Sequence, residues 1–145
     1  KTVYLKDDSP IYRDSCLEFF LAPVGNRSEY INIECNSRGF SLCEFGAERD
    51  GRSPVFSLCG LRPRVTPLKG EENNEKFWGV VIFVQLELIS ALYSIPLKEL
   101  KINNVRANFY KCGDDTDTPH YIAFSPVSTL PPGFHNHACF FDFTV

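Results

Sequence analysis

The chain has 145 residues, of which 43% are hydrophobic and 14% aromatic, and its formal net charge is −3. This length and apolar content suit one domain, residues 1–145, built around one core. The weak negative charge and the lack of a lysine- or arginine-rich run argue against a nucleic-acid partner, and no apolar run approaches the ~20 residues of a membrane helix. We therefore expect neither nucleic acid nor membrane as a partner.

Short stretches that alternate polar and apolar residues recur along the chain, separated by turn-forming segments rich in Pro, Gly, Asn and Asp. They predict strands, in chain order, at 3–5, 15–21, 30–36, 40–45, 55–61, 77–88, 105–112, 121–124 and 139–145. The segment ISALYSIPLKEL alone indicates a helical turn, which Pro96 limits. Strands at this spacing predict an all-β fold, an antiparallel sandwich or barrel.

Alternation also predicts which side chains share a face of the sheet, because successive residues of a strand point to opposite sides. If the strands at 15–21, 30–36 and 105–112 belong to one sheet, one face is apolar core and the other is polar. The polar face then carries Glu18, Asn32, Glu34, Asn108 and Tyr110. Glutamate and asparagine are poor strand formers, which suggests a functional surface; an ordinary solvated face is the competing interpretation.

Six cysteines would allow three disulfides, but several lie in apolar strand-like runs, where a free cysteine behaves as a small buried hydrophobe. We therefore expect reduced thiols and favour a cytoplasmic over a secreted protein, while the sequence leaves the localisation unknown. Alternation places Cys16 on the polar side of its strand and Cys35 on the apolar side of the next. Their side chains should point apart, which predicts that no disulfide joins them.

Two segments carry groups that suit a metal ion. In FHNHAC, His135, His137 and Cys139 recur at period two, and Cys112 and His120 are further candidates for a zinc constellation. The acidic turn GDDTDTP offers oxygen ligands of the kind that calcium prefers. Hydrogen-bonded loop histidines and a solvated turn are the simpler interpretation, so we expect no cofactor, with calcium as the alternative.

Five segments together resemble one known family. They are DSCLEFF (14–20), EYINIECNSRG (29–39), RANFYKCGD (106–114), PHYIAFSP (119–126) and FHNHACFFDF (134–143). In this order and spacing they resemble the carbohydrate-binding modules of family 9 and their free-standing relatives. The resemblance implies a sandwich of two antiparallel sheets, immunoglobulin-like or jelly-roll-like in connectivity, without some strands that members carry before the position of Lys1. It also implies sugar binding without catalysis.

The resemblance further implies a site in which rings stack on a sugar while polar groups bond its hydroxyls. Two tryptophans that clamp the sugar in related modules are replaced here by Ile11 or Tyr12 and by Phe134, whereas the family's acidic residue is retained as Glu18. The expected ligand-binding residues are Tyr12, Glu18, Asn32, Glu34, Asn108, Tyr110, Phe134 and His135. The alternative is a member that has lost sugar binding and serves as a protein-interaction or structural domain.

Overall fold

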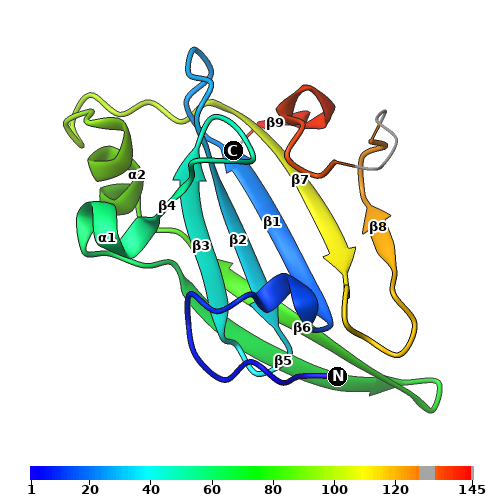
Figure 1. Cartoon of the computed structure of the whole chain (residues 1–145). Helices are drawn as coiled ribbons and strands as arrows, with labels where there is room; N and C mark the ends of the chain where they lie inside the picture. The colour runs from blue at the N-terminus through cyan, green and yellow to red at the C-terminus, as the bar shows by residue number, and fades with distance from the viewer. Residues whose placement is uncertain (128–132, 145) are drawn as a thin grey trace.

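The computed structural model describes residues 1–127 and 133–144 (Figure 1). The strands are β1 (Cys16–Ala22), β2 (Tyr30–Asn36), β3 (Ser41–Gly46), β4 (Ser53–Pro54), β5 (Arg64–Glu72), β6 (Glu75–Phe83), β7 (Asn104–Cys112), β8 (Tyr121–Ala123) and β9 (Phe141–Thr144). The helices are α1 (Val55–Cys59) and α2 (Leu86–Tyr93), with 3-10 turns η1 (Ile11–Arg13) and η2 (His137–Cys139). Strands therefore dominate the described chain.

These strands form two antiparallel sheets. The larger sheet has the order β4-β3-β2-β1-β7-β8, with β9 also paired to β7, and the smaller one is the β5-β6 hairpin. The hairpin crosses behind the large sheet (Figure 1), and its Val65, Val80 and Ile82 pack against the core of that sheet. The predicted all-β fold with two packed antiparallel sheets is confirmed.

The core lies between the hairpin face of the large sheet and the elements that cover it. Ile31, Ile33 and Cys35 of β2 are fully buried there, because odd positions of this strand all point to one side. Leu88 and Tyr93 of α2 join the same cluster, so the second helix closes one end of the core. This is the apolar face that alternation predicts.

The opposite face, which alternation assigns to polar residues, is also largely covered. The turn η1 and the segment 133–140 lie over it (Figure 1). Phe140 of that segment packs with Phe20, Tyr30 and Tyr110 in a second buried cluster. The interpretation of this face as an ordinary solvated one was wrong, because residues distant in sequence fold back over it. Its polar side chains are therefore buried and must find partners inside the protein.

The strand prediction failed in several places. Residues 55–61, predicted as a strand, begin helix α1 directly after Pro54, and the predicted strand 77–88 ends at Phe83 and is followed by α2. Short apolar runs do not distinguish a strand from a buried helix by periodicity alone. Residues 3–5 form no strand either.

Strand β5 was not predicted, since Pro67, Gly70 and four charged residues disguise its pattern. It belongs to a two-stranded hairpin, where proline is tolerated because each strand has an unpaired edge. The turn that links it to β6 contains Asn73 and Asn74 at φ 52° and 65°, a left-handed pair that asparagine adopts readily in tight hairpins.

Register confirms the separation of Cys16 and Cys35. Cys16 lies opposite Asn36, and Cys35 lies opposite Leu17, so the two thiols point to different faces of the sheet and no disulfide joins them.

In the described residues no helix has both the length and the apolar content needed to cross a bilayer.

Candidate functional site

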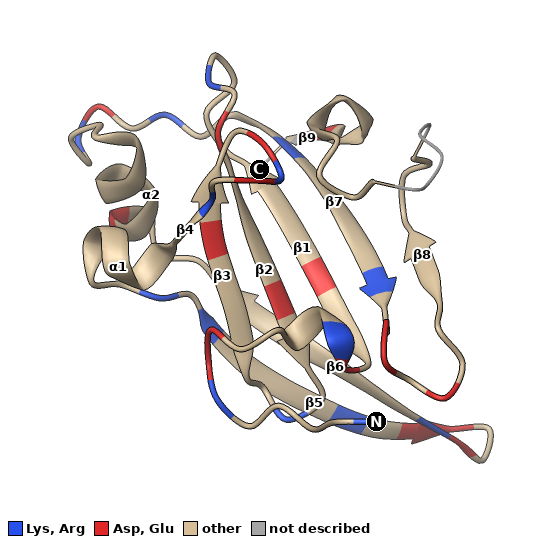
Figure 2. Ribbon diagram, in the orientation of Figure 1, with Lys and Arg blue, Asp and Glu red and all other residues tan. Residues whose placement is uncertain are grey.

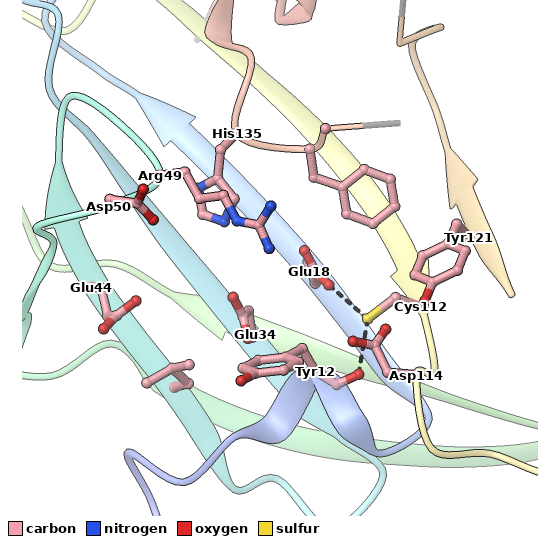
Figure 3. Close-up of a pocket in the computed structure, with 13 residues that line it drawn as sticks. Tyr12, Glu18, Glu34, Glu44, Arg49, Asp50, Cys112, Asp114, Tyr121 and His135 are labelled. Atoms are coloured by element: carbon pink, nitrogen blue, oxygen red, sulfur yellow. Dashed lines mark hydrogen bonds between the residues drawn. The ribbon is translucent and has the colours of Figure 1, made fainter. Parts of the chain in front are cut away.

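A cavity of about 310 Å³ opens on the face of the large sheet that carries the predicted polar residues (Figure 3). This volume lies at the lower end of the range for small-molecule sites. Strands β1, β2, β3 and β7 form its floor, while η1, the loop before β4 and the segment 133–135 form its walls. Its lining residues are Tyr12, Glu18, Glu34, Leu42, Glu44, Arg49, Asp50, Cys112, Asp114, Tyr121, Gly133, Phe134 and His135.

Two glutamates lie side by side on the floor of the cavity. Glu18 of β1 is directly opposite Glu34 of β2, and the two residues are only 6% and 4% exposed. The Cys112 thiol donates a hydrogen bond of 2.7 Å to Glu18 Oε1, and Asn32 Nδ2 donates one of 2.9 Å to Glu34 Oε1. Glu34 Oε2 has no partner among the described residues. We call Glu18 and Glu34 the carboxyl pair.

Burial shifts the protonation of the carboxyl pair. Desolvation raises the pKa of Glu18 well above its usual range, and the neighbouring Cys112 adds to the effect. Desolvation likewise raises the pKa of Glu34, and the proximity of Glu18 raises it further. Each carboxyl therefore holds its proton to a higher pH than an exposed glutamate, so the pair can both donate and accept hydrogen bonds.

Aromatic rings stand at the rim of the cavity. The Phe134 ring stacks on Tyr110 with centroids 4.2 Å apart and an interplanar angle of 12°, while the Tyr110 hydroxyl donates to the Phe134 carbonyl. Tyr121 of β8 meets Phe134 edge-on at 6.3 Å, and Tyr12 of η1 reaches in from the other side (Figure 3). Stacking on Tyr110 restricts the Phe134 ring, which gives the cavity a positioned apolar wall.

Arg52, just before β4, supports the floor from one side. Its guanidinium lies 4.1 Å from the centre of the Tyr30 ring and donates to Asn32 Oδ1 at 2.9 Å and to the Tyr30 carbonyl at 2.8 Å. It also donates to the Gly46 and Glu48 carbonyls, both at 3.0 Å. One side chain thus links β2 to the loop that carries Arg49 and Asp50 into the cavity wall.

His135 closes the cavity near Tyr30. Its Nδ1 lies 2.8 Å from the Tyr30 hydroxyl, and its ring packs on Phe20 at 4.8 Å. Burial lowers the pKa of His135 to about 4, and the charges of Arg52 and Arg49 contribute in the same direction. The imidazole is therefore neutral at neutral pH.

We expect His135 to make the protein less stable in mild acid. Its folded pKa lies below the unfolded value of about 6.5, so the unfolded chain binds a proton first, and stability falls as pH drops from about 6.5 towards 4. Allowing for its partial exposure, the loss should be roughly 1 to 2 kcal/mol. Urea denaturation of the wild type and of His135→Gln at pH 7.5 and pH 4.5 measures it; an equal loss in both proteins would contradict the assignment.

Acidic residues dominate the charge of the cavity. Strands β1, β2 and β3 each carry one acidic residue (Figure 2): Glu18 lies opposite Glu34, and Glu44 lies opposite Asn32, two residues along β2 from Glu34. Asp50 and Asp114 add two more carboxylates, whereas Arg49 is the single lysine or arginine in the described lining. The cavity therefore favours ligands that donate hydrogen bonds or carry positive charge.

The structure brings together most of the residues that the sequence points to. Tyr12, Glu18, Glu34, Phe134 and His135 all line the cavity. The other three expected residues do not line it, although they lie on the same face. They support the site from below, because Asn32 bonds Glu34 and Arg52, Asn108 bonds the Ser125 and Cys139 backbone, and Tyr110 stacks under Phe134.

Several lining residues were not expected as ligand contacts. Leu42 and Glu44 have the same period-two spacing as the polar residues of β2, to which β3 pairs, so face assignment extended to β3 would have found them. Arg49 and Asp50 come from a loop without any pattern of its own. Asp114 and Tyr121 flank the turn between β7 and β8, and only the pairing of those strands places them at the rim.

The candidate zinc ligands of FHNHAC do not converge among the described residues. His135 bonds Tyr30, His137 starts the turn η2, and His120 Nε2 lies 2.6 Å from Lys111 Nζ. A different group, Cys16, Glu18 and Cys112, places its ligand-type atoms within 4.8 Å of one another. Period two failed as a guide because the residues around His137 are not extended.

The carboxylates of the acidic turn do not cluster either. The Asp115 carboxylate pairs with Arg13 Nε at 3.8 Å, Asp117 is exposed, and Asp114 turns into the cavity (Figure 3). In the described chain these three aspartates form no cluster of metal-ligand atoms. The calcium alternative therefore has no preformed set of ligands among these three aspartates.

Comparison with known proteins agrees with the fold. The family model for carbohydrate-binding family 9 matches residues 1–145. The crystal structure of a proposed carbohydrate-binding protein from Bacteroides uniformis ATCC 8492 superposes with a TM-score of 0.71 and 28% sequence identity. The match covers 99% of this chain and 66% of that protein, and a search of curated proteins finds no match. The chain belongs to carbohydrate-binding family 9.

Proposed function

We propose that the cavity over β1, β2 and β7 binds a mono- or oligosaccharide weakly and without chemical change. The observation that carries this proposal is the convergence of aromatic rings and buried carboxyls in one small cavity. Phe134, Tyr12 and Tyr121 offer ring surface, and the carboxyl pair offers directed hydrogen-bonding groups. A site of this composition suits a sugar, whose rings have apolar faces and hydroxyl edges.

The size of the cavity limits how much sugar it can enclose. At about 310 Å³ it suits one sugar ring or the end of a chain better than a long internal segment. Each hydrogen bond to a strongly hydrated sugar yields only ~0.5 to 1.5 kcal/mol net, so a few such bonds correspond to micromolar to millimolar affinity.

We infer that the carboxyl pair does not hydrolyse the sugar. Glycosidases hold two carboxyl groups on either side of the scissile bond, at separations of about 5 to 9.5 Å. Glu18 and Glu34 are instead neighbours on adjacent strands of one cavity floor, with β-carbons about 5 Å apart. A glycosidic bond above this floor cannot lie between them.

The proposal also requires no cofactor. EDTA should therefore leave sugar affinity unchanged, and a loss of affinity would point to calcium.

A second candidate function, protein interaction, draws on the opposite face of the sheet. There Phe109, Ile122 and Phe124 are 44%, 60% and 72% exposed, and the rings of Phe109 and Phe124 meet edge-on at 6.0 Å. Exposed apolar groups that cluster in this way can mark a contact surface. If no sugar binds, protein interaction becomes the preferred function.

Replacing Phe134 with alanine should weaken sugar binding about tenfold or more, because the positioned ring wall is lost. Glu18→Gln keeps the shape of the side chain and removes its charge, and we expect a loss of several-fold. Isothermal calorimetry against a panel of mono- and oligosaccharides measures both effects, with a melting curve to confirm that each variant folds. Phe124→Ala, on the opposite face, is the matched control and should bind as the wild type does.

Two outcomes would reject the proposed site. One is the absence of any sugar binding by the full-length wild-type protein. The other is wild-type affinity in both Phe134→Ala and Glu18→Gln, which would place the sugar elsewhere on the molecule.

A further inference from the structure

The carboxyl pair lacks a cationic partner within the described protein. Arg52 gives its guanidinium to Asn32 and to backbone carbonyls. Lys111, on the other face of β7, gives its ammonium to the Cys112 carbonyl and to His120. Two like-charged groups directly opposite one another on adjacent strands destabilise the sheet unless a cation or shared protons neutralise them. A ligand that supplies positive charge at this point would relieve that repulsion.

Glu34 Oε2 marks where such a charge fits. This oxygen is buried without a hydrogen-bond donor in the described residues, and its side chain points into the cavity beside Glu18 (Figure 3). A buried acceptor without a donor destabilises the folded protein, and more so when it is charged. A ligand ammonium group carries three donors, so it can bond both carboxyls at once.

The rest of the lining favours the same type of ligand. Glu44, Asp50 and Asp114 surround the carboxyl pair, and Arg49 is the single arginine or lysine that opposes these five acidic groups. A sugar acid would meet repulsion from this set, while a neutral sugar would leave the charge uncompensated. Burial raises the pKa of both glutamates, and a bound cation would lower these pKa values again, because it favours the charged carboxylates.

We propose that the sugar bound in this cavity is an amino sugar, whose protonated amine lies between Glu18 and Glu34. This inference rests on the sugar-binding function proposed above and names the class of sugar. Tyr121, whose ring meets that of Phe134 edge-on, lies across the cavity from Glu34 (Figure 3), so a sugar ring that stacks on this aromatic wall can direct a substituent towards the carboxyl pair. An acetylated amine carries no charge and is larger, so it should lose the advantage.

A metal ion is the competing cation. Cys16, Glu18 and Cys112 offer ligand-type atoms within 4.8 Å of one another. Cys16, however, is fully buried and does not line the cavity, and the Cys112 thiol is already bonded to Glu18. An amine uses the side of the pair that faces the cavity and needs neither thiol.

The test compares sugars that differ only at the amine. Calorimetry at about pH 6, well below the pKa of such amines, measures glucosamine, glucose and N-acetylglucosamine, and then the same three forms of galactose. We expect the amine form of one series to bind at least about tenfold more tightly than its neutral and acetylated counterparts. We also expect the preference to shrink in high salt, because screening weakens the charge contact.

The variant Glu34→Gln keeps the shape of the side chain and removes its charge, so the ratio of amine to neutral affinity should fall to about one. Glu71→Gln, an equivalent change at an exposed position of β5, should keep the wild-type ratio. If Glu34→Gln fails to fold by its melting curve, Glu18→Gln provides the same comparison.

The outcomes separate the two proposals. Equal binding of glucosamine and glucose, or an unchanged ratio in the folded Glu34→Gln variant, overturns the amino-sugar inference and leaves sugar binding in place. Binding of no sugar at all overturns both. Stoichiometric zinc in the purified protein, with an amine preference that appears or disappears on EDTA treatment, assigns the site to a metal and also overturns the inference.

Discussion

Replacing Arg52 with alanine should lower the free energy of unfolding by about 3 to 5 kcal/mol, the largest effect that we expect from a single change. The guanidinium is largely buried and donates to Asn32 and to carbonyls of β2, β3 and the loop that follows β3. Its removal takes this donor from the buried Asn32 and from the partly buried carbonyls of Tyr30, Glu44 and Gly46, and also ends its contact with the Tyr30 ring. Chemical denaturation monitored by circular dichroism measures the loss.

The same change should also abolish sugar binding, because Arg52 holds both Asn32, which orients Glu34, and the loop that carries Arg49 and Asp50. Arg62→Ala is the matched control. Arg62 pairs with Asp8 at the surface, where an ion pair contributes about 1 kcal/mol or less. A loss in Arg52→Ala no larger than that of the control would mean that water replaces the guanidinium without cost.

Asp14→Ala should destabilise the protein by about 2 to 4 kcal/mol. The Asp14 carboxylate is 1% exposed and accepts hydrogen bonds from the backbone of Val3 at 2.8 Å and Tyr4 at 3.1 Å. It also accepts one from Asn36 Nδ2 at 3.1 Å, so one side chain joins the N-terminal segment to the end of β2. Without it, three donors lose an acceptor, and one of them belongs to the fully buried Asn36.

Because Asp14 immediately follows η1, its loss should also displace Tyr12 from the cavity wall and weaken sugar binding. Asp117→Ala, an equivalent change in the exposed turn between β7 and β8, should alter stability by less than about 0.5 kcal/mol. Thermal and urea melts of both variants decide the point. Equal stability of the two variants would refute the role assigned to Asp14.

The strands of the large sheet were predictable because their side chains alternate. In β2, period two separates Ile31, Ile33 and Cys35 from Asn32 and Glu34, and the observed register keeps these two sets on opposite faces. This pattern arises within a single strand and depends on no other part of the chain. For that reason the shared face of Glu18 and Glu34 could be predicted from the sequence.

Helix α1, the start of α2 and strand β5 were not predictable by the same argument, whereas the helical turn predicted in ISALYSIPLKEL coincides with the rest of α2. The run from Val55 is apolar in either conformation, and its helix packs against α2 and β3, which contribute contacts that no local pattern encodes. Strand β5 holds its extended form through its pairing with β6, although Pro67 and its many charges disfavour a strand.

The amino-acid sequence by itself determined the all-β class, the two faces of β1, β2 and β7, and five of the residues that line the cavity. Each of these follows from local alternation or from a family pattern. Only the tertiary structure decided that the polar face is covered, that Arg49, Asp50 and Asp114 join the cavity, and that Glu34 Oε2 has no donor in the described part of the chain. Those features depend on which distant segments fold over the sheet, and burial and hydrogen-bond partners are set by that packing rather than by neighbours in the chain.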